Sequence, residues 1–329
     1  MRLRRQNGIS TLIACQNEEA TVGWCILSFL DFSDEIIVID NGSTDASKEI
    51  CREMARRYPE KVSFYDVPHL KDLYENRQYA FERSHYNWIV RADADYICYT
   101  DGEYDCRNVR EFLLSRRLWH RPFILKVKQP SVHGDFWHTA EAEAPDRERW
   151  PMAFSQVDHP MGRIYPWLPG MRFARLGRWE GVCYPKPLHR LVTHFTWKEP
   201  IWMHCNIKSE MNFFARSERT NWRESGDFTR YPTLESFLRV AAVEKFGSSD
   251  LDEAARLYTE SQVLPQLQEY DPASLFPYPS LAAEAMKMAP CYRIHIGDGG
   301  PERKYLGPMD LDSNRTAQSK EGLVGSSTR

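Results

Sequence analysis

Residues 34–45 read DEIIVIDNGSTD, and this stretch decides the fold. Residues 36–39 are all β-branched, which is typical of a strand, and the run ends at Asp40 in a cluster of turn-forming residues. A continuous apolar run of this length predicts a strand that is buried on both faces, as in parallel sheets. An acidic residue directly after such a strand lies at the edge where α/β proteins bind their ligands.

Strand and helix patterns alternate on both sides of this stretch. Further strands are predicted at 9–14, 62–65 and 87–91. Between them, apolar residues recur at helical spacing in 22–30, around Ile50 and Met54, and in 73–81. Strands separated by helices of this length imply βαβ units and a parallel, doubly wound sheet.

The pattern changes after residue 100. A strand is predicted at 123–127, whereas 128–200 is rich in Pro, Trp and Arg and shows no clear periodicity. Helices are predicted at 234–246 and 251–263, with Gly247 as a C-terminal stop and Ser249 and Asp252 as a capping box. The polar tail 313–329 is predicted to be disordered. We therefore expect a core over 1–205 and a helical C-terminal extension over 206–312.

Composition places the chain among ordinary globular proteins. It has 329 residues, of which 42% are hydrophobic and 27% charged. No apolar run approaches the length of a membrane span, and no signal-peptide stretch follows the basic start, so a cytoplasmic protein is expected, with peripheral membrane contact left open. The net charge of −3 gives no global argument for binding nucleic acid. The eight cysteines include no C-x-x-C pair, which argues against a zinc ribbon or a redox motif.

Polar, largely acidic residues follow three of the predicted strands. These are residues 14–19 (ACQNEE), 40–45 (DNGSTD) and 92–95 (ADAD). Carboxylates repel a phosphate but bind it through a divalent cation, so this acidic rim suggests a nucleoside diphosphate held through a metal. The chain contains neither G-x-G-x-x-G nor a P-loop lysine motif, which weighs against dehydrogenases and P-loop ATPases.

Residues 10–19 (STLIACQNEE), 34–45 and the DAD motif at 93–95 together resemble family-two glycosyltransferases. Arg77, sixteen residues before Asp93, matches the arginine of that family's Ala-Arg-Asn-type helix. The resemblance covers about residues 9–100. It implies a GT-A-type α/β fold with a mostly parallel sheet flanked by helices, a nucleotide-binding part at 9–100 and an acceptor side at 101–205. It also implies a nucleoside-diphosphate sugar donor, UDP-sugar above others, and Mn²⁺ or Mg²⁺.

The resemblance also implies roles for single residues. Nucleotide contacts fall on Ala14, Gln16, Glu18, Asp40, Arg77, Asp93 and Ala94, with Asp40 at the base or ribose. Asp95 becomes the metal ligand, and Asp93 faces the ribose or the metal. The family commonly has Pro and Tyr where this chain has Ala14 and Gln16, which leaves the identity of the base open.

Two later segments also resemble parts of that family. Residues 163–173 (RIYPWLPGMRF) and 177–180 (GRWE) match a segment that reads roughly Gly-Arg-Ile-His-Glu at its end, so Trp179 replaces a histidine and Glu180 is retained. Residues 202–204 (WMH) and Lys208 resemble the strand end that completes the metal and diphosphate site. His204 is accordingly a candidate metal ligand, with an ordinary structural histidine as the alternative.

Family-two enzymes generally invert the anomeric centre, which requires a base. Glu180 is the first candidate because it is the lone acid within residues 161–190, and Asp158 is the second. The same stretch holds six Lys or Arg residues and several aromatic ones. It is either an acceptor groove, in which nucleic acid stays an option, or a solvated basic face over an aromatic cluster.

Other classes of protein stay open at this point. A sugar-nucleotide pyrophosphorylase shares a related sheet, but its glycine-rich loop after the first strand is missing. Two other classes also stay open: a non-catalytic protein that binds a nucleotide-sugar or a carbohydrate, and a nucleic-acid-binding module. For an enzyme, the acceptor is a glycan, a peptide side chain or a modified nucleobase, with a glycan favoured by family frequency.

Overall fold

The computed structural model describes residues 5–70, 72–115, 121–140, 161–176, 179–288, 291–297 and 300–308. The strands of its central sheet are β1 (Gln6–Cys15), β2 (Glu35–Asp40), β3 (Val62–Asp66), β4 (Tyr86–Asp93), β6 (Phe123–Lys128), β9 (Met161–Pro166) and β12 (Thr193–Pro200). The shorter strands are β5 (Tyr96–Cys98), β7 (Ser131–His133), β8 (His138–Ala140), β10 (Arg172–Leu176), β11 (Trp179–Cys183), β13 (Trp202–Asn206), β14 (Leu267–Glu269), β15 (Tyr292–Gly297) and β16 (Gly300–Tyr305).

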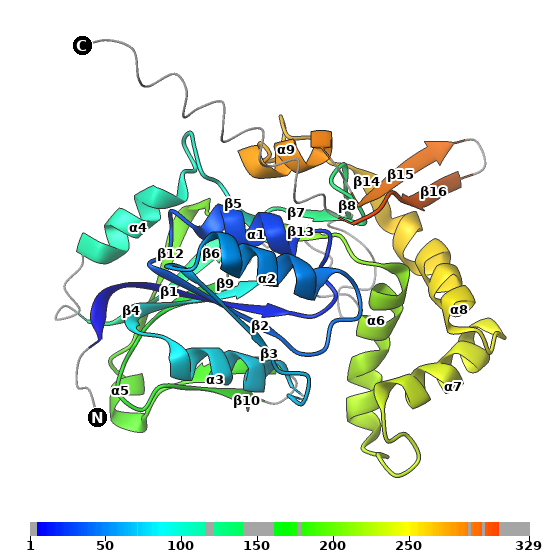
Figure 1. The fold of residues 1–329 in the computed structure, drawn as a ribbon, viewed down its shortest axis with the longest axis horizontal. Helices are drawn as coiled ribbons and strands as arrows, with labels where there is room; N and C mark the ends of the chain where they lie inside the picture. The colour runs from blue at the N-terminus through cyan, green and yellow to red at the C-terminus, as the bar shows by residue number, and fades with distance from the viewer. Residues whose placement is uncertain are drawn as a thin grey trace.

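The helices flank this sheet and continue beyond it (Figure 1). They are α1 (Val22–Phe29), α2 (Ser47–Arg57), α3 (Leu73–Arg83), α4 (Cys106–Ser115), α5 (Lys186–His189), α6 (Glu210–Ser225), α7 (Leu234–Phe246), α8 (Leu251–Tyr258) and α9 (Ser280–Met288).

The central sheet is mixed but mostly parallel. In the described part of the chain its strand order is β12-β6-β9-β4-β1-β2-β3. Strands β1, β2, β3 and β4 run parallel, as do β6 and β12, whereas β9 is antiparallel to both of its neighbours. The predicted doubly wound sheet is confirmed. Strand β9 was not predicted, because the sequence around it shows no strand period.

Alternate residues of the parallel strands pack on opposite faces of the sheet. In β1, Ile9 and Ile13 join the cluster that contains the buried residues of α1 and α2, such as Trp24 and Met54. Leu12, between them, joins a second cluster with Phe81 of α3. Figure 1 shows α1 and α2 on one side of the sheet and α3 on the other.

A small sheet joins segments that are far apart in the sequence. Strand β13 pairs with β5 on one side and with β7 on the other. In this register His204 lies opposite both Tyr96 and Ser131. The histidine of β13 is therefore brought next to the end of the DAD motif.

The C-terminal part contains the predicted helices and more. Helix α7 has the predicted bounds, and Gly247 ends it with a positive φ of 70°, a conformation that favours glycine. Helix α8 continues as a π-helical turn, Thr259–Val263, and a 3₁₀ turn, Leu264–Gln266. The predicted capping box was wrong, because the Asp250 side chain caps α8 by accepting from the N–H groups of Asp252 and Glu253.

The β15–β16 hairpin was not predicted. Helices α6, α7 and α8 share their own apolar cluster, which includes Phe214, Ala242 and Tyr258. Ala285 of α9 and Tyr292 of the hairpin belong instead to the main core. The boundary at residue 205 stays a prediction.

No helix in the described part of the chain is both long and apolar enough to cross a bilayer. The predicted disordered tail and Asp158 lie outside the described residues.

Candidate functional site

The strand register gathers the predicted rim residues at one edge of the sheet. Ala14 of β1 lies beside Asp93 of β4, and Cys15, the last residue of β1, lies beside Asp40 of β2. Because these strands are parallel, the residues that follow them meet at the same edge. The acidic rim expected from the sequence therefore exists as a spatial unit.

Asp93 is held by several cationic side chains. Arg77, buried in α3, contacts one carboxylate oxygen of Asp93 and donates to the carbonyl of Leu12 at 2.8 Å. The other oxygen accepts from the Tyr96 hydroxyl at 2.7 Å and lies 3.5 Å from the Arg163 guanidinium. Burial raises the pKa of Asp93, but the charges of Arg77, Arg163 and Arg91 outweigh burial and hold that pKa well below its usual range.

Asp95 and Glu18 share one buried lysine. The Lys208 ammonium is 1% exposed and donates to Asp95 Oδ2 and to Glu18 Oε1, both at 2.6 Å. Burial raises the pKa of Asp95, but the charges of Lys208 and His204 outweigh burial. The pKa of Asp95 therefore lies well below its usual range. Burial raises the pKa of Glu18, and the charge of Asp95 raises it further, whereas the charge of Lys208 lowers it. The resulting pKa is about 7.

Glu180 lies in the same network. Its Oε1 is 3.0 Å from Nε of Arg91 and 3.6 Å from Nε of Arg77. Arg77 thus links the predicted base to Asp93. Neither Arg91 nor the contact of Arg163 with Asp93 was predicted from the sequence. Arg91 directly follows the apolar run 88–90 inside β4, and a charged residue at such a place is the signal that could have found it.

Asp40 is fully buried and holds the turn that follows β2. Its Oδ1 accepts from the N–H groups of Gly42 and Ser43, both at 2.9 Å, and its Oδ2 accepts from the Ser43 hydroxyl. Gly42 has a φ of 101°, which disfavours any residue with a Cβ. The structure therefore gives Asp40 a role in the shape of the rim.

The other predicted nucleotide contacts differ in exposure. Ala14 and Gln16 are half-buried at the rim, and Gln16 Oε1 accepts from Arg219 of α6 at 2.9 Å. Ala94 is 1% exposed, and its side chain belongs to the main core.

The predicted metal ligands Asp95 and His204 lie next to each other. Their closest atoms, Oδ2 and Nε2, are 3.2 Å apart, and Ser131 Oγ orients the imidazole from 3.2 Å on its Nδ1 side. Among the described residues, Asp95 Oδ1 is buried without a hydrogen-bond partner. No group of three His, Cys, Asp or Glu residues that could hold a metal occurs in the described part of the chain. A carboxylate and an imidazole, completed by diphosphate oxygens, fit Mn²⁺ or Mg²⁺.

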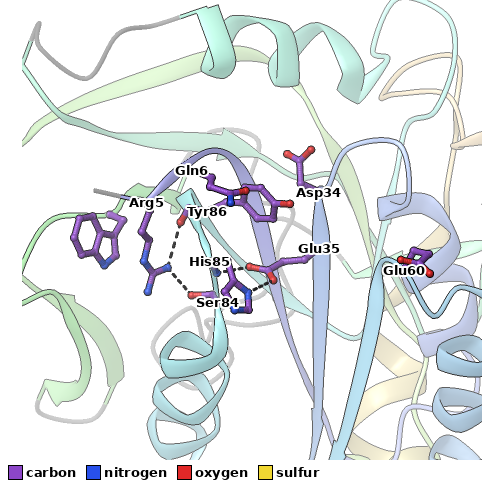
Figure 2. Close-up of a pocket in the computed structure, with 9 residues that line it drawn as sticks. Arg5, Gln6, Asp34, Glu35, Glu60, Ser84, His85 and Tyr86 are labelled. Carbon is purple, nitrogen blue, oxygen red and sulfur yellow. Dashed lines mark hydrogen bonds and ion pairs between the residues drawn. The ribbon is translucent and has the colours of Figure 1, made fainter. Parts of the chain in front are cut away.

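A cavity of about 510 Å³ lies at the opposite edge of the sheet. Figure 2 shows Arg5 directed toward Ser84 and Tyr86, and His85 paired with Glu35. The closest atoms of His85 and Glu35 are 2.8 Å apart. Gln6 and Glu35, the first residues of β1 and β2, also line it. The cavity is therefore at the amino ends of the parallel strands, away from the acidic rim.

Comparison with known proteins agrees with the resemblance. Residues 10–103 match the family model described as glycosyl transferase family 2. The matched range contains all three motif segments, and it agrees with the α/β class and the glycosyltransferase activity expected from them. No curated protein matches the chain.

Solved structures to which the chain shows similarity include TarS 1–349 of S. aureus in complex with UDP-GlcNAc. It is 12% identical, with 92% of this chain and 99% of that chain covered and a TM-score of 0.40. Glucosyl-3-phosphoglycerate synthase from Mycobacterium tuberculosis, in complex with Mn²⁺, UDP and glucosyl-3-phosphoglycerate, is 19% identical. There 66% of this chain and 77% of that chain are covered, with a TM-score of 0.36.

Proposed function

We propose that this glycosyltransferase moves a sugar from a UDP-sugar to an acceptor with inversion at the anomeric carbon and with a divalent cation. The observation that carries the proposal is the cluster of Asp93 and Asp95 with Lys208 and His204 at the carboxyl edge of the parallel strands. Such an edge is where open α/β sheets bind nucleotides. UDP as the nucleotide follows from the family resemblance. A cytoplasmic location, with peripheral membrane contact left open, belongs to the same proposal.

The metal would be held by Asp95 and His204. When bound, a divalent cation offsets the negative charge that develops on the leaving diphosphate. Lys208 keeps the Asp95 carboxylate in place through a direct hydrogen bond. Ser131 positions the imidazole of His204 from behind.

The chain's own residues would orient the donor and accept a proton. Arg77 joins Leu12 of β1 to Asp93 and would thereby hold the edge at which the nucleotide binds. The acceptor oxygen attacks the anomeric carbon, the bond from that carbon to the diphosphate oxygen breaks, and a carboxylate takes the acceptor's proton. Glu180 is our candidate for this base, and Asp158, which lies outside the described residues, is the alternative.

The described basic residues of the stretch 161–190 differ in exposure, which weighs against one continuous groove for a long nucleic acid. Arg163, the first of the basic residues in 161–190, is 2% exposed and points inward to Asp93. Arg172 and Arg175 of β10 are exposed. The basic stretch is therefore divided between the network and the surface. A glycan, a peptide side chain and a modified nucleobase all stay within the proposal.

The test is a thermal-shift screen of nucleoside diphosphates and their sugars, with and without Mn²⁺, followed by donor hydrolysis and transfer assays. UDP and a UDP-sugar should raise the melting temperature, and Mn²⁺ should enlarge the shift. Asp95→Asn should abolish the Mn²⁺-dependent part, whereas the exposed Asp101→Asn should retain it. Stabilisation by nucleotide sugars without hydrolysis or transfer would instead indicate a non-catalytic binding protein. No response to any nucleotide would overturn the proposal.

A further inference from the structure

Three arginines line one face of α6. Arg216, Arg219 and Arg223 are spaced i, i+3 and i+7, so their side chains project from the same side of the helix. We call them the α6 arginine row. Figure 1 shows α6 beside the ends toward which β1 and β2 run, and Asn212 of α6 donates to the Asn17 carbonyl at 2.9 Å. The row is thus held against the acidic rim.

Two arginines of the row contact rim residues, and the third contacts the start of α3. Arg216 lies 3.7 Å from Glu18, and its side chain is 37% exposed. Arg219 donates to the Gln16 amide oxygen at 2.9 Å. Arg223 forms an ion pair with Asp72, at the start of α3, at 2.7 Å. Two arginines therefore have acidic neighbours, and the central one has a neutral partner.

The positive charge of Arg219 is not neutralised locally. Within the described ranges, no carboxylate lies at ion-pair distance from its guanidinium. Burial, together with the charges of Arg216 and Arg223, lowers the pKa of Arg219 to about 10 against the opposing charge of Asp72, so the group stays protonated at neutral pH. A guanidinium presents five N–H donors in a planar fork, which matches the geometry of phosphate oxygens.

The network around Asp93 and Asp95 offers no comparable excess of positive charge. Among the described residues, its cations are matched one to one by carboxylates: Arg77, Arg91, Arg163 and Lys208 against Glu18, Asp93, Asp95 and Glu180. An incoming phosphate group adds negative charge to this balanced network. Among the described residues, Arg219 lies at the rim without a carboxylate at ion-pair distance, and Arg216, one helical turn away, shares Glu18 with Lys208.

We propose that the α6 arginine row binds a phosphoryl anion, with Arg219 at its centre. The assignment of that anion to the diphosphate of the donor rests on the proposed function. A phosphate carried by the acceptor has the same chemistry and is the other source. In either case the row supplies positive charge that does not depend on a bound metal ion.

The test is calorimetry in EDTA with inorganic pyrophosphate, UDP and uridine as probes. Arg219→Gln and Arg216→Gln should each weaken pyrophosphate and UDP binding about tenfold or more, the effect of losing a charge-assisted hydrogen bond. Uridine binding should stay unchanged. Arg219→Lys should restore part of the affinity, and Arg239→Gln, which removes an exposed pair with Glu235 on α7, should match the wild type. Melting temperatures establish that each variant is folded.

Competition identifies the source of the anion. If saturating UDP displaces pyrophosphate, the row belongs to the donor site; if pyrophosphate binds in addition to UDP, the row serves a phosphate on the acceptor. The inference is overturned if the wild type binds no pyrophosphate or if the Gln variants bind it as tightly as the wild type does. It is also overturned if the Gln variants lose as much affinity for uridine as for pyrophosphate. If pyrophosphate binding depends on the row while UDP and Mn²⁺ have no effect on the protein, that result would contradict the proposed function but would still support the anion site.

Discussion

At the scale of single residues, Glu180 has two possible roles that differ in what they predict. A base must reach the acceptor, whereas a positioning residue acts through Arg77 and Arg91, which its carboxylate contacts. Both roles depend on the same charge. Substitution by Gln keeps the shape and removes the charge, so kinetics can separate them.

Glu180→Gln should lower kcat by about 10²–10⁴-fold while leaving the affinity for UDP near that of the wild type, because a base acts on the acceptor and not on the nucleotide. Steady-state kinetics and UDP calorimetry check both quantities. The matched control is Glu224→Gln at the exposed end of α6. A large loss of UDP affinity with kcat retained would show that Glu180 positions Arg77.

Asp40→Ala should destabilise the fold as well as disturb the nucleotide site. The substitution leaves the N–H groups of Gly42 and Ser43 without their acceptor in a buried turn. We expect the free energy of unfolding to fall by about 2–4 kcal/mol. Urea denaturation measures it, and Asp31→Ala, at an exposed position, should change it by less than about 0.5 kcal/mol. Equal stability of both variants would contradict the role given to this carboxylate.

The residues found from motifs and those that complete the network differ in whether the sequence reveals their place. Asp40, Asp93 and Asp95 follow strands and could be found from the sequence. Arg91 and Lys208 could not be assigned their contacts, because each meets its partner only after distant segments pair. Lys208, for example, reaches Glu18 from a position 190 residues later in the chain.

At the scale of elements, the first four parallel strands and their helices were predictable because each has a clear period. Strands β9, β10 and β11 were not, since their residues alternate irregularly and lie in a Pro- and Trp-rich stretch. The β15–β16 hairpin was missed for a different reason. Its residues are largely polar, and Tyr292 and Ile294 are its main buried apolar side chains.

The position of α6 depends on its contact with α7. Glu218 of α6 is buried, with a side chain 4% exposed, and pairs with Lys245 of α7 at 2.5 Å. Lys245→Met should leave the carboxylate without its ammonium partner. Because the lysine itself is 44% exposed, we expect a loss of only about 1–2 kcal/mol in unfolding free energy.

The same variant tests whether anion binding by the arginine row depends on how firmly α6 is held. Lys245→Met should also weaken pyrophosphate binding slightly, because α6 is less firmly held. Lys287→Met, in the last turn of α9, is the control. Urea denaturation and calorimetry provide the two readouts. An unfolding free energy equal to that of the control would mean that Glu218 is adequately satisfied by Asn221, which donates to it at 3.0 Å.

At the scale of the whole molecule, a buried histidine couples stability to pH. His133 of β7 lies between the small sheet and α6, where it stacks on Phe213 and contacts the Asn206 amide at 2.6 Å. Burial, reinforced by the charges of His204, Arg303 and neighbouring basic groups, lowers the pKa of His133 from 6.5 to about 3. The imidazole is therefore neutral in the folded protein throughout the range in which it becomes charged in the unfolded chain.

The sign of the effect follows from proton binding. Between pH 6.5 and 3 the unfolded state binds the proton and the folded state does not, so stability falls as pH falls through this window. The full loss is on the order of 5 kcal/mol at the acid end. His133→Gln keeps a side chain that can accept from Asn206 but does not titrate. Urea denaturation at pH 7, 5.5 and 4.5 should therefore show a shallower decline for the variant than for the wild type.

The exposed His69→Gln supplies the comparison, because it removes a histidine at the surface and leaves the buried imidazole in place. The free energy of unfolding of His69→Gln should decline with falling pH in parallel with that of the wild type. The difference in this decline between the two Gln variants then gives the contribution of the buried imidazole. Parallel curves for all three proteins would mean that His133 takes up its proton in the folded state. The segment between the small sheet and α6 would then open in acid before the molecule unfolds, and hydrogen exchange at β7 and β13 would detect that opening.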